Sequence, residues 1–171
     1  MSIVIFSRPV RTGKTTELMT WCGRQHNITG VLMPDNEGTR KIINLSTNEV
    51  FNLECTDPAD TDQELLKVGR FYFYASIFTR VNNDLVNMLK TNPHWMVLDE
   101  VGKLELNCSG FYDAVTAMIS AHQHQTITSN ILLVVRESLL NEVIGFFKID
   151  THQVVQNLQL LPMENNTGKI R

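Results

Sequence analysis

The sequence predicts an α/β fold with a mostly parallel central sheet. Short apolar runs alternate with longer amphipathic stretches along the 171 residues, which is the pattern of strands connected by helices. The run at 131–135 is apolar without interruption, as are parallel strands that are buried on both faces. A hydrophobic content of 43 % is enough for one sizeable core. We therefore expect a single domain over residues 1–171.

The first elements are a strand, a helix and a β-rich segment. Residues 3–6 have the pattern of a buried strand, and a helix is predicted from Gly13 to about residue 24. Three short β-like pieces follow, separated by turn-forming residues. They lie at 30–33, 39–45 and 49–53. We interpret the segment at about 28–55 as a small β-meander inserted after the first helix.

The alternation of strands and helices resumes near residue 70. Ser76 and Ser109 are candidate N-caps of the two following helices. Strands are predicted at 70–74, 95–98 and 131–135 and near 154–155, and helices at about 76–89, 110–122 and 139–147. Residues 164–171 form a polar C-terminal tail.

Composition argues against several classes of partner. The formal net charge is -3 and no basic stripe is present, so neither nucleic acid nor anionic lipid is expected as a partner. No apolar run is long enough to span a bilayer. The three cysteines form no CxxC pair, which argues against a zinc site and a disulfide framework. We expect a cytoplasmic protein, and the sequence gives no indication of its oligomeric state.

A phosphate-binding motif follows the first strand. Residues 8–16 read Arg-Pro-Val-Arg-Thr-Gly-Lys-Thr-Thr and contain the Gly-Lys-Thr core of a Walker A loop. Gly13 allows the backbone to approach a phosphate closely, and Lys14 reaches the terminal phosphates. Thr15 supplies a hydroxyl to Mg²⁺, and Thr16 lies near the first phosphate. This pattern predicts a P-loop that binds a nucleoside triphosphate with Mg²⁺ as cofactor.

The motif departs from the consensus at its first position, where Arg8 replaces a glycine. A side chain there costs roughly 1–3 kcal/mol if the loop demands an unusual backbone angle. The alternative is that the loop tolerates Arg8 and gains a positive charge near the phosphates. Arg11 and Thr12 belong to the same loop, and we expect both to contribute to nucleotide binding.

A second motif supplies carboxylates. The apolar strand at 95–98 runs into Asp99 and Glu100, as in a Walker B motif, which places both acids at the carboxyl edge of a parallel sheet. Asp99 is suited to hold Mg²⁺, and Glu100 to orient or deprotonate the attacking water. Arg136 follows another predicted strand, where it is a candidate to stabilise transition-state charge or to contact the base.

Residues 99–106, Asp-Glu-Val-Gly-Lys-Leu-Glu-Leu, resemble the Asp-Glu-x-Gly-x-x-Glu motif of a small family of nucleoside triphosphatases, first described from hyperthermophiles and also found in animals. The resemblance covers most of the chain. It implies a P-loop NTPase three-layer sandwich similar to nucleotide kinases, and slow hydrolysis of several nucleoside triphosphates.

The resemblance also assigns roles to residues. It implies that Lys14, Thr15, Asp99 and Glu100 carry the chemistry, and that Gly102 and Glu105 shape the adjacent loop. From the two motifs we expect Lys14 and Glu100 to act in catalysis, and Thr15 and Asp99 to hold the metal.

We therefore expect Mg²⁺-dependent binding of ATP or GTP and slow hydrolysis to diphosphate and phosphate. Two alternatives stay open. A nucleotide or small-metabolite kinase uses nearly the same groups and differs in what occupies the acceptor position. A nucleotide-binding module with a degenerate P-loop would bind without turnover, and Arg8 is the basis for that reading.

Overall fold

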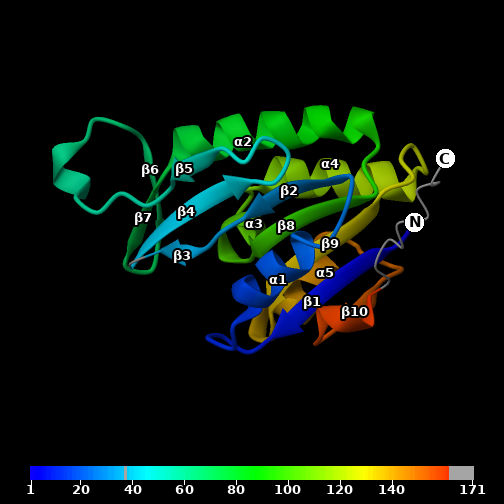
Figure 1. Cartoon of the computed structure of the whole chain (residues 1–171). Helices are drawn as coiled ribbons and strands as arrows, with labels where there is room; N and C mark the ends of the chain where they lie inside the picture. The colour runs from blue at the N-terminus through cyan, green and yellow to red at the C-terminus, as the bar shows by residue number, and fades with distance from the viewer. Residues whose placement is uncertain (37, 162–171) are drawn as a thin grey trace.

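An eight-stranded sheet runs through the molecule in the order β10-β1-β9-β8-β2-β4-β3, with β5 paired to β4 (Figure 1). The computed structural model describes residues 1–36 and 38–161, so the polar tail predicted at 164–171 lies outside the described residues. The first five strands in this order pair in parallel. They are β10 (Gln153–Val155), β1 (Ile3–Arg8), β9 (Asn130–Arg136), β8 (Trp95–Val101) and β2 (Ile28–Leu32). The predicted α/β fold with a mostly parallel sheet is confirmed.

The sheet continues into antiparallel strands after β2. Strand β4 pairs antiparallel with β2, and β3 and β5 each pair antiparallel with β4. These strands are β3 (Asp35–Asn36), β4 (Thr39–Asn44) and β5 (Val50–Asn52). The predicted meander forms, because β2 pairs antiparallel with β4 and β4 with β5. The prediction did not include the second role of β2, which is also a strand of the parallel sheet, with Gly30 opposite Val97 of β8.

Gly30 is required by this close pairing. Its φ is 128°, and a Cβ atom at this position would collide with the carbonyl oxygen of Val97. The glycine therefore lets β2 and β8 approach, and β8 is the strand that carries both predicted acids.

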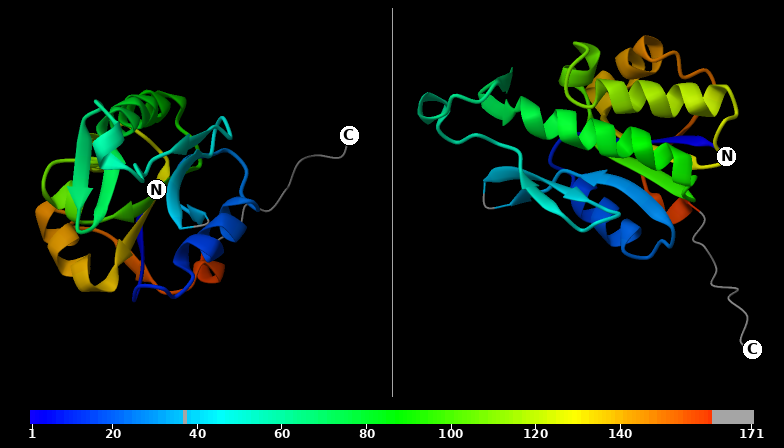
Figure 2. Two further views of the ribbon diagram at one scale, coloured as in Figure 1. Left: turned by 90° about the vertical axis from the view of Figure 1, so that its left-hand side faces the viewer. Right: turned by 90° about the horizontal axis from the view of Figure 1, so that it is seen from above.

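Helices cover both faces of the sheet and make three layers (Figure 2). The alternation along β1 separates the two cores: Ile3 and Ile5 pack with α2, α4 and α5, whereas Val4 and Phe6 pack with α1 and η4. The helices are α1 (Lys14–Cys22), α2 (Ala75–Met88), α3 (Lys103–Leu106), α4 (Tyr112–Gln123) and α5 (Leu140–Phe146). Four short 3₁₀ helices are η1 (Pro58–Asp60), η2 (Leu89–Thr91), η3 (Glu137–Leu139) and η4 (Leu158–Leu160). No helix among the described residues has the length and apolar character that a membrane span needs.

A separate two-stranded hairpin projects from one end of the molecule (Figure 1). It consists of β6 (Leu65–Val68) and β7 (Phe71–Tyr74). Strand β7 was predicted, but its partner β6 was not. Because β7 runs directly into α2, that helix begins at Ala75, and the hydroxyl of Ser76 donates to Gln63 instead of capping the helix.

The second predicted cap is also wrong. Helix α4 begins at Tyr112, and Ser109 accepts a hydrogen bond from the Tyr112 N–H through its backbone carbonyl.

Candidate functional site

The predicted phosphate loop connects β1 to α1. Lys14 is the first residue of α1 and follows Gly13, whose φ is 75°. The Lys14 ammonium donates to the carbonyl oxygens of Arg8 at 3.2 Å and Pro9 at 2.8 Å. The hydroxyl of Thr12 donates to the same Pro9 oxygen at 2.8 Å. The lysine is therefore held inside its own loop, at the N-terminus of a helix, where the backbone favours an anion.

Arg8 is the last residue of β1 and pairs in parallel with Arg136 of β9. Its φ is not positive, whereas that of Arg11 is 60°. The backbone at position 8 therefore does not have the unusual angle that would require a glycine, and Arg8 causes no strain there. The Arg8 guanidinium forms a 2.8 Å ion pair with Glu17 of α1 and lies over the Phe6 ring.

Asp99 is fully buried in β8 and lies close to Thr15 of α1. One carboxylate oxygen, Oδ2, accepts the N–H of Met33 at 3.1 Å. The other, Oδ1, has no hydrogen-bond partner. Burial raises the pKa of Asp99 to about 6, while the N–H of Met33 and the hydroxyl of Thr15 oppose that shift. A buried carboxylate oxygen without a partner, close to a threonine hydroxyl, is suited to coordinate a hard cation.

Glu100 has a strained backbone. Its φ is 62°, and the pairing of β8 with β9 shifts register between Leu98 and Val101. A left-handed conformation at a residue other than glycine costs about 1–3 kcal/mol and is concentrated at functional sites. Positive φ angles also occur at residues far from the predicted site, such as Lys148, so the contacts of the Glu100 side chain decide its role.

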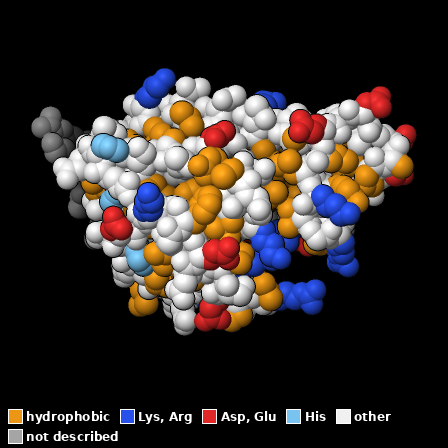
Figure 3. Space-filling model, turned by 180° about the vertical axis from the view of Figure 1, so that it is seen from behind, with side chains coloured by type: hydrophobic (Ala, Val, Ile, Leu, Met, Phe, Trp, Pro, Cys, Tyr) orange, Lys and Arg blue, Asp and Glu red, His pale blue; other side chains and the backbone are white. Residues whose placement is uncertain are grey.

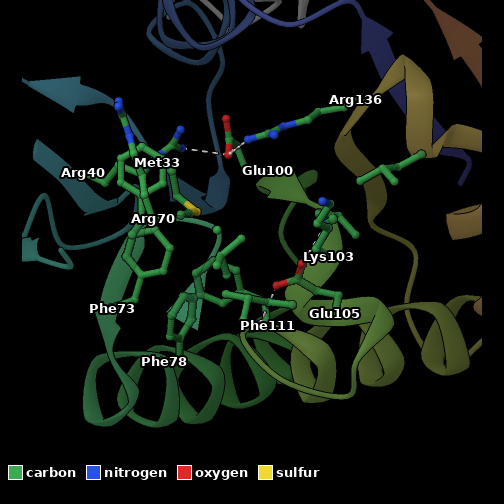
Figure 4. A pocket seen from close by; sticks show the side chains of 17 residues that line it. Met33, Arg40, Arg70, Phe73, Phe78, Glu100, Lys103, Glu105, Phe111 and Arg136 are labelled. Atoms are coloured by element: carbon green, nitrogen blue, oxygen red, sulfur yellow. Dashed lines mark hydrogen bonds and ion pairs between the residues drawn. The ribbon is translucent and has the colours of Figure 1, made fainter. Parts of the chain in front are cut away.

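Two arginines reach the Glu100 carboxylate from opposite sides (Figure 4). Arg40 of β4 contacts Oε2 at 2.8 Å, and Arg136 at the end of β9 contacts the same oxygen at 3.2 Å. The sequence interpretation included Arg136 but missed Arg40. No local pattern could have found Arg40, because the contact joins positions 60 residues apart.

The structure brings the predicted site residues into electrostatic range of one another. Burial lowers the pKa of Lys14. The charges of Glu100 and Asp99 act to raise this pKa, and those of Arg136 and Arg8 lower it further. Lys14 therefore lies near both acids. Three other predicted residues, Arg11, Thr12 and Thr16, are exposed at the loop and the start of α1.

Glu105 organises the segment that follows the acids. Its two carboxylate oxygens accept the N–H of Gly102 at 2.7 Å and the N–H of Phe111 at 2.9 Å. Burial raises its pKa, and these two N–H groups oppose the shift. Glu105 thereby ties the segment after Glu100 to the start of α4.

A cavity of about 240 Å³ lies beside Glu100. It is bounded by β4, the β6–β7 hairpin, α2 and α3 (Figure 4). The phenylalanines in its wall, and Arg40 and Arg70, were not assigned to the site from sequence. The best available signal was the aromatic run at 71–74, but a buried or half-buried strand is the better interpretation of that run from sequence.

Comparisons with known proteins agree with this fold. THEP1 from the hyperthermophile Aquifex aeolicus has a similar crystal structure, with a TM-score of 0.66 and 16 % identity over 91 % of this chain and 89 % of that one. A human cancer-related nucleoside triphosphatase has a similar solution structure, with a TM-score of 0.60 and 19 % identity over 90 % of this chain and 87 % of that one. No protein with a curated description matches the chain in sequence. The sequence profile of the NTPase family matches residues 4–159, and the chain therefore belongs to the NTPase family.

Proposed function

We propose that this protein binds a nucleoside triphosphate with Mg²⁺ at the β1–α1 loop and slowly hydrolyses it to diphosphate and phosphate. Membership of the NTPase family supports binding and hydrolysis of nucleoside triphosphates in general terms. The observation that carries the specific assignment is the strained, arginine-bound Glu100 near Lys14 and Asp99. We also propose a cytoplasmic location, for which the three free cysteines are the support.

The phosphate loop supplies the binding energy in this proposal. Lys14 now donates to two loop carbonyls, and a bound triphosphate would replace those acceptors with charged oxygens, which form stronger hydrogen bonds. Gly13 leaves open space around its Cα, because a Cβ atom built there meets nothing within 4 Å. Backbone N–H groups of this loop and of Thr15 and Thr16 complete the proposed anion site.

Asp99 and Thr15 are the proposed Mg²⁺ ligands. The unpartnered Oδ1 of Asp99 fits this role, since a buried carboxylate oxygen otherwise lacks compensation for its lost hydration. No cluster of three or more acidic, histidine or cysteine side chains suited to a metal occurs in residues 1–36 and 38–161. Protein Mg²⁺ sites beside phosphates commonly use only one or two carboxylates. When bound, the ion would offset negative charge on the terminal phosphates.

Glu100 is the proposed residue that orients or deprotonates the attacking water. Its carboxylate carries two guanidinium partners, and a terminal phosphate would compete with it for both. Arg40 and Arg136 would then stabilise the charge that develops on the transferring phosphoryl group, while Glu100 is released toward the water.

A binding module without turnover receives less support. That reading relied on Arg8 distorting the loop, yet Arg8 has no positive φ and its charge is paired with Glu17. The kinase alternative is favoured by a different observation, the cavity beside Glu100.

Paired binding and turnover measurements on Glu100→Gln test this proposal. Phosphate release should fall at least 100-fold, because orientation and proton transfer by one side chain contribute about 10²–10⁴ in rate. The affinity for a fluorescent nucleotide should stay within threefold of the unsubstituted protein. Glu49→Gln is the matched control, since Glu49 pairs with Arg80 on the surface. Undiminished release by Glu100→Gln would remove Glu100 from this role.

A further inference from the structure

The cavity beside Glu100 has an apolar floor and a cationic rim. Four phenylalanines contribute to its lining, and they pack in a continuous chain of ring contacts with centroids 4.9–6.4 Å apart. These are Phe71, Phe73, Phe78 and Phe111. Phe71 is half-buried and the other three rings are buried, so the floor is an apolar surface that favours the apolar part of a ligand over a polar group.

The rim carries an excess of positive charge. Arg40, Arg70, Lys103 and Arg136 line the cavity, against two carboxylates. One of those carboxylates, Glu105, is already engaged by two backbone N–H groups. Arg70 is exposed and lies over the Phe71 ring at 5.0 Å. Seen from behind, basic side chains gather around a hollow beside the end of the molecule that carries the hairpin (Figure 3). A ligand with an anionic group is therefore favoured over a neutral one.

The cavity lies on the terminal-phosphate side of the proposed nucleotide. Lys14 and Thr15 are the groups that meet the terminal phosphates, and Glu100 faces the end at which attack occurs. Glu100 lines the cavity, and no residue of the phosphate loop does. A molecule in the cavity is thus placed where an acceptor approaches the terminal phosphorus, and away from the base, which continues from the first phosphate near Thr16.

We propose that this cavity holds a phosphoryl acceptor of the chemical class of nucleoside monophosphates, which combine one planar base with an anionic phosphate. The inference rests on the proposed function, because that function places the triphosphate on the other side of Glu100. The volume of about 240 Å³ is below the approximately 300–1,000 Å³ of sites for drug-sized ligands. It suits one ring system, with the charged group held at the arginine rim.

The transfer balances without any further reactant. An oxygen of the acceptor phosphate forms a bond to the terminal phosphorus, and the bond from that phosphorus to the oxygen bridging to the second phosphate breaks. One triphosphate and one monophosphate give two diphosphates. A dianionic acceptor phosphate loses no proton. Hydrolysis is then the reaction that occurs when water, and not the acceptor, reaches the same phosphorus.

Arg40 links the acceptor to the catalytic carboxylate. Its guanidinium contacts Glu100 at 2.8 Å and lies 5.7 Å from the centre of the Phe71 ring. An anion bound at the rim would share Arg40 with Glu100, so the cavity and the hydrolytic residue are joined through one side chain.

The test follows the label from a γ-³²P-labelled triphosphate in the presence of Mg²⁺ and each common nucleoside monophosphate. Label should pass to at least one monophosphate, and in Arg70→Ala the ratio of transferred to released label should fall at least tenfold. Arg70→Lys should recover part of that loss, because it keeps the charge without the planar fork. Arg80→Ala, whose ion pair with Glu49 lies outside the cavity, should leave the ratio unchanged.

Calorimetric titration of monophosphates into protein saturated with a non-hydrolysable triphosphate reports the cavity independently of turnover. Absence of binding at millimolar monophosphate, with hydrolysis intact, overturns the proposal. Binding that leaves all label in free phosphate overturns the acceptor role. If the protein releases no phosphate at all, the proposed function fails, and this titration alone decides whether the cavity is a ligand site.

Discussion

Arg8 and Glu17 form a 2.8 Å ion pair that joins the end of β1 to the first turn of α1 across the phosphate loop. The other oxygen of Glu17 accepts the N–H of Leu158 at 2.8 Å, so the same carboxylate also anchors η4. Arg8, the residue that departs from the P-loop consensus, therefore helps to hold the two ends of the loop together. Its extended backbone has no need of glycine.

Arg8→Gly should lower stability without improving the enzyme. It removes an ion pair between partly exposed groups and adds backbone freedom to a strand, which together cost about 1–2 kcal/mol. Urea denaturation measures this loss, and kcat should change by less than threefold. Glu17→Gln removes the same charge pair without changing the backbone and serves as the control. A tenfold rise of kcat in Arg8→Gly would show that Arg8 obstructs the loop.

Asp99 makes stability depend on pH in an unusual direction. Its folded pKa of about 6 lies above the ordinary value of 3.8, so the native protein binds more protons than the unfolded chain between these values. Stability of the nucleotide-free protein therefore falls as pH rises through this window. A shift of this size corresponds to at most about 3 kcal/mol.

Asp99→Asn should therefore be more stable than the unsubstituted protein by about 1–3 kcal/mol at pH 8. The gain should vanish near pH 4, where Asp99 is protonated in the native state. Urea denaturation across this pH range measures the difference, with Asp84→Asn, at a half-buried position of α2, as the control. A gain that is the same at pH 4 and pH 8 would exclude ionisation of Asp99 as its cause.

Gly30→Ala should prevent folding or cost more than about 3 kcal/mol, because the new methyl group would collide with the backbone of β8. Gly69→Ala is the matched control. Its φ of 60° is also positive, but nothing lies within 4 Å of the added carbon, so the cost should be about 1–2 kcal/mol. Circular dichroism during thermal unfolding distinguishes the two. Similar losses in both variants would mean that β2 and β8 can separate.

Arg136→Ala should lower kcat at least tenfold while nucleotide affinity changes less than threefold. The guanidinium at the Glu100 carboxylate is suited to stabilise charge that develops during transfer, and such donors contribute about 10²–10³ in rate. Steady-state phosphate release and nucleotide titration separate the two effects. Loss of affinity with unchanged kcat would assign Arg136 to ground-state binding.

Contiguous patterns in the sequence predicted much of the fold and of the candidate site. Strands β1, β8 and β9 are apolar runs, and the phosphate loop and the acid pair each lie within a few consecutive residues. Such features depend on local order along the chain. The neighbouring residues also predicted that Glu100 would come after an apolar run. They could not predict the strain in its backbone, because that strain depends on the register shift between β8 and β9.

Features that depend on distant pairing were not predicted. The parallel pairing of β2 with β8 was not predicted, because β8 lies more than sixty residues away and short apolar runs have the same pattern in a meander as in a parallel sheet. Arg40 reaches Glu100 only because β4 lies beside β2 in the folded sheet. The cap at Ser76 failed because β7 leads into α2 without the turn that a serine cap requires.

Multiple-turnover phosphate release is the most direct test of the proposed activity. Purified protein is mixed with excess ATP or GTP and Mg²⁺, beside Lys14→Ala prepared in parallel. We predict linear release over many turnovers by the unsubstituted protein, lost at least 100-fold in Lys14→Ala. Equal release by both proteins, or nucleotide binding with no release by either, would contradict the proposal that this site hydrolyses nucleoside triphosphates.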